Sequence, residues 1–144
     1  MKIYLATSWR TRTHPDVLRS LRGAGHEVYD FRDPRNVGQL DGFHWSDIDS
    51  NWQGWDSNRY MRALDHPEAV KGFQSDMNAL RGCDVCVLLL PCGRSAHWEL
   101  GWASGAGKKT AIILELHPVP ELMYKGVDFL ARSVQEVIYW LEEK

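Results

Sequence analysis

Glu99 is the residue of this chain whose surroundings most favour chemistry. It follows the run 83–90, an almost uninterrupted apolar stretch that is typical of a strand buried on both faces of a parallel sheet. A polar turn, 93–95, separates this run from a helix that we expect to begin near Ala96, with Glu99 in its first turn. Ser95 could already cap that helix, and the neighbours of Glu99 are largely apolar. A chemical role for Glu99 is therefore favoured over a structural role at the helix start.

Length, charge and hydropathy limit the class of protein. The chain has 144 residues, of which 44% are hydrophobic, enough to fill the core of one domain. The formal net charge of −2 argues against a partner that is a nucleic-acid polymer. No segment approaches the roughly 20 apolar residues of a membrane span, and the N-terminal apolar stretch is too short for a secretion signal. We therefore expect a cytoplasmic protein that acts on a small molecule and has no membrane partner.

The three cysteines do not predict a metal site or a disulfide framework. Cys83 and Cys86 fall on or beside an expected strand, where residues three apart point to opposite faces. No second pair of cysteines follows them, and an odd number of cysteines leaves at least one unpaired. We expect Cys83, Cys86 and Cys92 to be free thiols, and we expect no metal and no other cofactor.

Hydrophobic periodicity alternates between strands and helices along most of the chain. Strands are expected at 2–6, 26–31, 83–90, 108–114 and 127–131. Helices are expected over 13–23 or 13–25, 58–64, 67–81, 96–107 and after the capping box that begins at Ser133, with a short helical turn at 120–125. Gly72 is a potential break in the third of these helices.

The segment 32–57 is expected to be an irregular, tryptophan-rich loop. It is rich in Gly, Asp and Asn, and it is long for a connection within a small domain, which is typical of a functional or disordered loop. Disorder is disfavoured because Phe43, Trp45, Trp52 and Trp55 carry too much apolar surface to leave in water.

Alternating strands and helices predict an α/β fold for the single domain 1–144. We expect a flavodoxin-like or Rossmann-like three-layer sandwich around a five-stranded parallel sheet of order 2-1-3-4-5. In this order the chain turns opposite ways after the first and third strands, and ligands bind in the crevice between them. Two polar turns, 7–10 and 93–95, meet at that crevice, and Glu99 lies at its mouth.

Three groups of residues carry a family resemblance. Tyr4 lies in the opening strand, Asp76 and Asp84 precede the central strand, and Glu99 opens the sequence ELGWASGAGK. In this order they resemble the nucleoside 2-deoxyribosyltransferase superfamily, which includes 2'-deoxynucleoside 5'-monophosphate N-hydrolases. A weaker match is LMYKGV, residues 122–127.

The resemblance implies cleavage or transfer at the N-glycosidic bond of a nucleoside or a nucleoside 5'-monophosphate. Glu99 would attack the anomeric carbon and hold the sugar as an ester, Asp76 would manage a proton on the base, and Tyr4 would orient Glu99. Water as the acceptor gives a hydrolase, whereas a second base gives a transferase. Asp76 could instead simply cap or solvate its helix. A non-catalytic nucleotide-binding sensor is the alternative for the whole chain.

The position of polar and aromatic residues around the expected crevice, together with the resemblance, predicts a set of substrate-binding residues. The resemblance, with Trp98 and Trp102 on the helix of Glu99, also implies a homodimer. The expected binding residues are Thr7, Ser8, Trp9, Trp45, Arg94, Ser95, His97 and Asp128. The chain departs from the family at Gly93, where many members carry aspartate or serine, and at Ser95 and His97, which are often glycine. Asp128 is the nearest substitute for a residue that the family borrows from a neighbouring subunit.

Several of these residues have a second interpretation of similar weight. Arg94 could hold a 5'-phosphate together with Ser8 and the helix start, or it could be a solvated surface residue. Trp45 and its neighbouring tryptophans could stack on a nucleobase or could form a hydrophobic plug over the sheet. His97 is better explained as a packing or hydrogen-bonding residue than as a base, and no second histidine follows it at zinc-site spacing.

Overall fold

The computed structural model describes residues 1–35 and 41–143, and its centre is a parallel sheet. The sheet has five strands in the order β2-β1-β3-β4-β5, which confirms the predicted topology. The strands are β1 (Lys2–Ala6), β2 (Glu27–Tyr29), β3 (Val85–Leu89), β4 (Lys109–Ile113) and β5 (Phe129–Ala131). Most are shorter than the apolar runs that predict them, because the run ends continue as loops.

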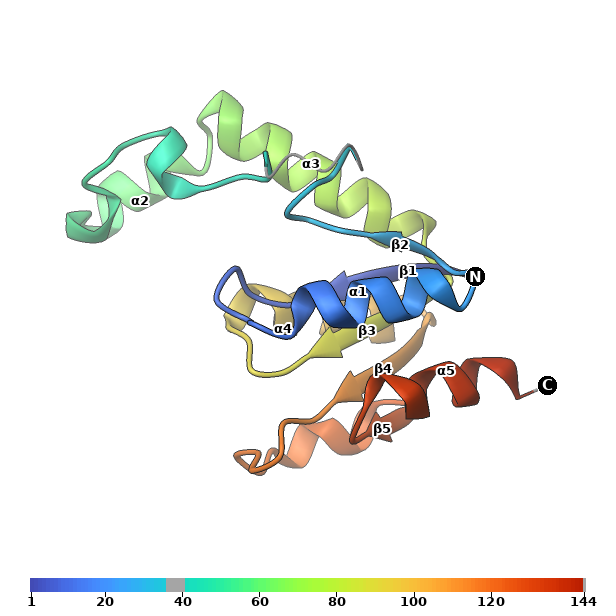
Figure 1. The fold of residues 1–144 in the computed structure, drawn as a ribbon. Helices are drawn as coiled ribbons and strands as arrows, with labels where there is room; N and C mark the ends of the chain where they lie inside the picture. Colours follow the sequence, from blue (N-terminus) through green and yellow to red (C-terminus); the bar gives the residue numbers. More distant parts are fainter. Residues whose placement is uncertain (36–40, 144) are drawn as a thin grey trace.

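Helices cover both faces of this sheet (Figure 1). The helices are α1 (His14–Gly23), α2 (Ser57–Ala63), α3 (Pro67–Gly82), α4 (Arg94–Gly105) and α5 (Val134–Glu142), with an additional 3-10 turn, η3 (Leu122–Gly126). Helices α1 and α5 pack together on one face, and α3 and α4 cover the other. Among the described residues, no helix is both long and apolar enough to cross a membrane.

Alternation along β1 divides the core into two clusters. Ile3 and Leu5 pack on the side of α1 and α5, whereas Tyr4 and Ala6 pack on the side of α3 and α4. This division follows from the period of two in a strand, which sends neighbouring side chains to opposite faces. Tyr4 is therefore a buried polar side chain that β1 contributes to the α3 and α4 face.

Two details of the helices differ from the expectation. Helix α4 begins at Arg94 with Gly93 as its N-cap, so Glu99 lies in the second turn and Ser95 is not the cap. A glycine cap leaves the first N–H groups of the helix without a side-chain acceptor. Helix α3 runs unbroken through Gly72, where a Cβ atom would lie 2.8 Å from the Phe43 side chain. Gly72 therefore permits a close approach of the loop rather than breaking the helix.

The described part of the tryptophan-rich segment is ordered by its own aromatic contacts. It forms two 3-10 turns, η1 (Trp45–Asp47) and η2 (Trp52–Gly54), before α2 begins. The Trp45 ring packs edge-on against Phe43, Trp55 and Tyr60. Together with α2 these turns lie at the far end of α3, away from the sheet (Figure 1). Residues 36–40 of the expected loop lie outside the described residues.

Candidate active site

Glu99 and Asp76 meet on the face of the sheet that α3 and α4 cover. Glu99 comes from the second turn of α4 and Asp76 from the middle of α3. Both carboxylates line a cavity of about 760 Å³. The walls of this cavity also include Phe43 and Trp45 from the loop and Ser95 from the start of α4. The structure thus brings together four of the expected site residues, namely Glu99, Asp76, Trp45 and Ser95.

The electrostatics of this pair are those of two buried carboxylates without an ion-pair partner among the described residues. Burial, followed by the charge of Asp76, raises the pKa of Glu99 to about 8. Burial also raises the pKa of Asp76 to about 6, against the opposing effect of a hydrogen bond from Tyr29. No Lys, Arg or His in the described ranges forms an ion pair with either carboxylate. The pair therefore holds a proton near neutral pH, which suits acid and base chemistry.

Tyr4 lies in β1, as the sequence predicts, and its hydroxyl interacts with both carboxylates. Its side chain is 1% exposed, and its hydroxyl makes no hydrogen bond of full geometry with a described residue. Burial and then the charge of Glu99 raise the Tyr4 pKa, so the hydroxyl stays protonated. The interaction with this hydroxyl in turn lowers the Glu99 pKa. Tyr4 is thus a buried, protonated hydroxyl that interacts with the carboxylate it is expected to orient.

Tyr29 is the residue of the site that sequence reasoning missed. It is paired with Tyr4 in the β1–β2 register, and the two rings stack with centroids 5.3 Å apart. Its hydroxyl donates to Asp76 Oδ1 at 2.9 Å. The available signal was the position of Tyr29 within the expected strand 26–31, which neighbours the strand of Tyr4 in the expected sheet order.

The turn after β1 is fixed to the turn after β3 by two threonines. The Thr7 hydroxyl donates to the Leu89 carbonyl at 2.8 Å, and the Thr11 hydroxyl donates to the Pro91 carbonyl at 2.7 Å. The two hydroxyl oxygens lie 2.9 Å apart. These bonds occupy Thr7, so its hydroxyl holds the two loops together. Ser8 is half-buried in the same turn, and its Oγ accepts from the Arg10 N–H at 3.2 Å.

Trp9 is packed between side chains rather than lining the cavity. Its ring lies 4.0 Å, centroid to centroid, from that of His44 and meets Phe31 edge-on. The guanidinium of Arg32 lies over the same ring, and it donates to the carbonyls of Ser8 and Trp9. Trp9 therefore anchors the segment after β2 to the turn after β1.

The remaining residues near α4 have different surroundings. Arg94 is exposed at the first position of the helix, and no described residue forms an ion pair with it. His97 Nδ1 lies 2.8 Å from the Gly93 carbonyl, and its Nε2 lies 2.7 Å from the Tyr124 hydroxyl. A carbonyl only accepts, so Nδ1 carries the proton and Nε2 accepts from Tyr124. His97 thus joins the start of α4 to η3, which agrees with a hydrogen-bonding role.

Two aspartates lie at the opposite edge of the sheet, at the amino ends of the strands. The Asp128 carboxylate accepts from the N–H of Thr110, at the start of β4, at 2.8 Å. The Asp84 carboxylate accepts from the N–H of Lys2 at 2.8 Å. The structure does not bring either residue to the Glu99 cavity of its own chain. A group of three or more metal-ligating side chains is absent from the described part of the chain.

Comparison with solved structures supports the fold assignment. No protein-family model matches the chain, and neither does any curated protein sequence. A structure of a 2-deoxyribosyltransferase from Bacillus psychrosaccharolyticus matches with a TM-score of 0.66 at 16% identity, over 96% of this chain and 90% of that one. A CMP N-glycosidase of Clostridium botulinum, BcmB, matches with a TM-score of 0.55 at 19% identity, over 99% and 100% of the two chains. Both belong to the nucleoside deoxyribosyltransferase superfamily, whose fold this chain shares.

Proposed function

We propose that this protein cleaves or transfers the N-glycosidic bond of a nucleoside or a nucleoside 5'-monophosphate through a covalent glycosyl-Glu99 intermediate. The observation that carries the proposal is the pair of carboxylates, Glu99 and Asp76, which line one cavity and form no ion pair with a described residue. The similarity in fold to a deoxyribosyltransferase and an N-glycosidase supports the same class of reaction.

The reaction proceeds in two displacements. In the first, a carboxylate oxygen of Glu99 bonds to the anomeric carbon while the bond to the base breaks. Asp76 gives its proton to the base, which departs with the bonding electrons. In the second, water or another base attacks the same carbon, the ester to Glu99 breaks, and Asp76 takes up the proton of the acceptor. Both carboxyl groups return to their starting states.

Substrate binding has to move the shared proton from Glu99, which holds it in the empty site, to Asp76. The Glu99 pKa of about 8 exceeds the Asp76 pKa of about 6, so the shared proton lies on Glu99 when the cavity is empty. Positive charge that develops at the anomeric carbon stabilises ionised Glu99, and negative charge on the departing base stabilises protonated Asp76. The charges that develop on the substrate therefore favour ionised Glu99 and protonated Asp76, which is the state that the first displacement needs.

Substrate contacts are assigned from the walls of the cavity and its rim. Trp45 offers an aromatic face and Ser95 a hydroxyl within the cavity. Arg94 and Ser8 would hold a 5'-phosphate at the start of α4, where the N–H groups favour an anion. Thr7, Trp9 and His97 act indirectly, because their polar groups or rings already bind other parts of the chain.

A homodimer would close the open side of the cavity. Phe73 is 59% exposed and Trp98 is 55% exposed, and both side chains line the cavity wall. A second copy that covered these rings would bury apolar surface and exclude water from Glu99. Asp128 is the residue proposed to reach the site of a neighbouring subunit. Sedimentation at micromolar protein should give a dimer or larger assembly, and a monomer would remove Asp128 from the site.

The experiment that tests the function is a substrate panel. The protein is incubated with ribo- and deoxyribonucleosides and with their 5'-monophosphates, and free base is measured by chromatography, with and without a second base as acceptor. Base release with water alone defines a hydrolase, and exchange of bases defines a transferase. Binding of nucleotides without release from any of them would instead support the alternative, a nucleotide-binding sensor.

A further inference from the structure

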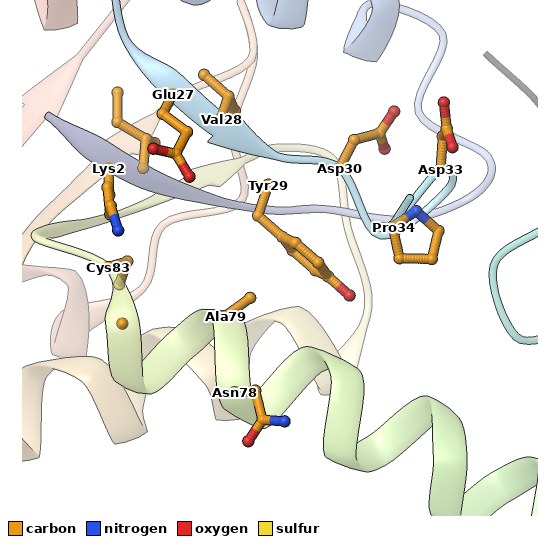
Figure 2. A pocket seen from close by; sticks show the side chains of 12 residues that line it. Lys2, Glu27, Val28, Tyr29, Asp30, Asp33, Pro34, Asn78, Ala79 and Cys83 are labelled. Atoms are coloured by element: carbon orange, nitrogen blue, oxygen red, sulfur yellow. The ribbon is translucent and has the colours of Figure 1, made fainter. Parts of the chain in front are cut away.

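Tyr29 connects two residues of α3 to the sheet. Its hydroxyl lies 2.9 Å from Asp76 Oδ1 and 2.9 Å from Ser75 Oγ. Figure 2 shows the Tyr29 ring extending from β2 towards α3, beside a cavity that Asn78 and Ala79 also line. The ring is held on its other side by stacking on Tyr4, with an angle of 20° between the two planes. The position of the hydroxyl is thus set by both strands.

The direction of the hydrogen bonds follows from the number of protons. Ionised Asp76 can only accept, so the single proton of Tyr29 points to it and the Tyr29 oxygen accepts from Ser75. When Asp76 is protonated on Oδ1, it can donate to Tyr29, which then donates to Ser75. Either direction fits the measured distances, since both hydroxyls can donate and accept. The chain of Ser75, Tyr29 and Asp76 is therefore satisfied in both states.

We propose that Tyr29, supported by Ser75, is a positioning residue that holds the Asp76 carboxyl in one orientation through both of its protonation states. The proposal rests on the function proposed above for its use in catalysis, because Asp76 gives and takes a proton once per turnover. A carboxyl that rotated between these states would lose its alignment with the base, and misalignment of this kind costs rate without loss of binding.

Other titratable groups interact with Asp76 or line a cavity that it also lines. They are Tyr4 from β1, Tyr29 from β2, Glu99 from α4, Glu68, Lys71 and Arg81 from the same helix, Asp65 just before it, and Arg35, Asp41 and Asp47 from the loop. Tyr29 is the one whose hydrogen bond lowers the Asp76 pKa. Its removal therefore moves the titration of Asp76 in a known direction, upwards.

The test compares Tyr29→Phe with Ser75→Ala and with a matched control, Tyr139→Phe, whose ring is exposed on α5. The Asp76 carboxyl is titrated by carbon NMR without substrate, with the signal assigned by its loss in Asp76→Asn. We expect Tyr29→Phe to raise the Asp76 pKa by about one unit, Ser75→Ala to raise it less, and Tyr139→Phe to leave it unchanged. The kcat of Tyr29→Phe should fall by about 10-fold with little change in KM.

The titration separates this proposal from the proposed function. An Asp76 pKa that is the same in Tyr29→Phe and the wild type would overturn the positioning role, as would an unchanged kcat in an active enzyme. A shifted titration in a protein that releases base from no substrate would establish the contact and overturn the proposed function instead. Retained ring stacking should keep Tyr29→Phe folded, and thermal unfolding checks this.

Discussion

Two buried acidic regions of this protein have opposite electrostatics. Glu99 and Asp76, on the side of α3 and α4, both have raised pKa values and no cationic partner among the described residues. Asp30, which follows β2, is also buried at 6% exposure. Its Oδ1 lies 3.2 Å from Nε2 of the buried His14, at the start of α1, and accepts from the Arg32 N–H at 2.9 Å.

The pKa of Asp30 differs in direction from that of Glu99 because hydrogen bonds and nearby charges oppose the effect of burial. Burial by itself raises the pKa of Asp30, as it does at Glu99. The hydrogen bonds from His14 and Arg32, with the charges of His14 and Arg22, outweigh that effect and lower the pKa. The fold therefore compensates the buried carboxylate that fixes loops, and leaves uncompensated the two carboxylates for which proton transfer is proposed.

The largest expected effect is the loss of base release in Glu99→Gln. The amide cannot form the ester intermediate, so the rate should fall by at least about 10³-fold. Folding should survive, which circular dichroism can verify. Near-wild-type turnover by this variant on any substrate would remove Glu99 from the mechanism.

Asp76→Asn should reduce both the rate and the Glu99 pKa. The rate should fall by about 10²-fold because the base loses its proton donor. Removal of the like charge should lower the pKa of Glu99 from about 8. The two effects are measured by base release and by NMR titration of Glu99. An unchanged Glu99 pKa would mean that the two carboxylates do not interact.

Asp30→Asn should damage stability and spare the chemistry. It removes the charge that His14 and the Arg32 N–H bind, which should cost about 1–3 kcal/mol of the free energy of unfolding in urea. Base release per folded molecule should match the wild type. A stable but inactive variant would contradict the division between a structural and a chemical carboxylate.

The pH dependence of stability should differ between Glu99→Gln and the wild type. The Glu99 pKa rises from 4.5 to about 8 on folding, so between these values the folded state binds more protons than the unfolded state. The wild type should therefore lose stability as pH rises through this window, by about 3–4 kcal/mol from pH 5 to pH 8. Glu99→Gln should lack this loss. The stability of both proteins is measured by thermal unfolding at each pH. The same change in stability with pH for both would contradict the burial of an uncompensated Glu99.

Arg94→Ala should have the smallest effect on base release, and it tests whether the substrate carries a 5'-phosphate. If Arg94 binds a 5'-phosphate, KM for a monophosphate should rise by about 10-fold while KM for the matching nucleoside stays constant. Equal losses on both substrates would make Arg94 a scaffold for Glu99. No loss on either would make it a surface arginine and favour an unphosphorylated substrate.

The sequence by itself determined the sheet and much of the site. Apolar runs predict the five strands, because a strand that is buried on both faces needs apolar residues along its length. The alternation of these strands with helices predicts the order 2-1-3-4-5, because each crossover between parallel strands is right-handed. The resemblance placed Glu99, Asp76 and Tyr4 together. In the structure the first two line one cavity, and the third interacts with Glu99. These features depend on residues that are close in sequence or on chain topology.

Only the tertiary structure decided which side chains are available for a ligand. Tyr29 binds a residue 47 positions away, and Thr7 donates to a carbonyl 82 positions away. Trp9 packs against Phe31 and His44, which lie on a different loop. Such contacts depend on how the elements pack across the sheet. The sequence does not show whether a hydroxyl is already hydrogen-bonded or a ring already packed. Long-range packing therefore removed Thr7 and Trp9 from the cavity wall and brought Tyr29 to Asp76.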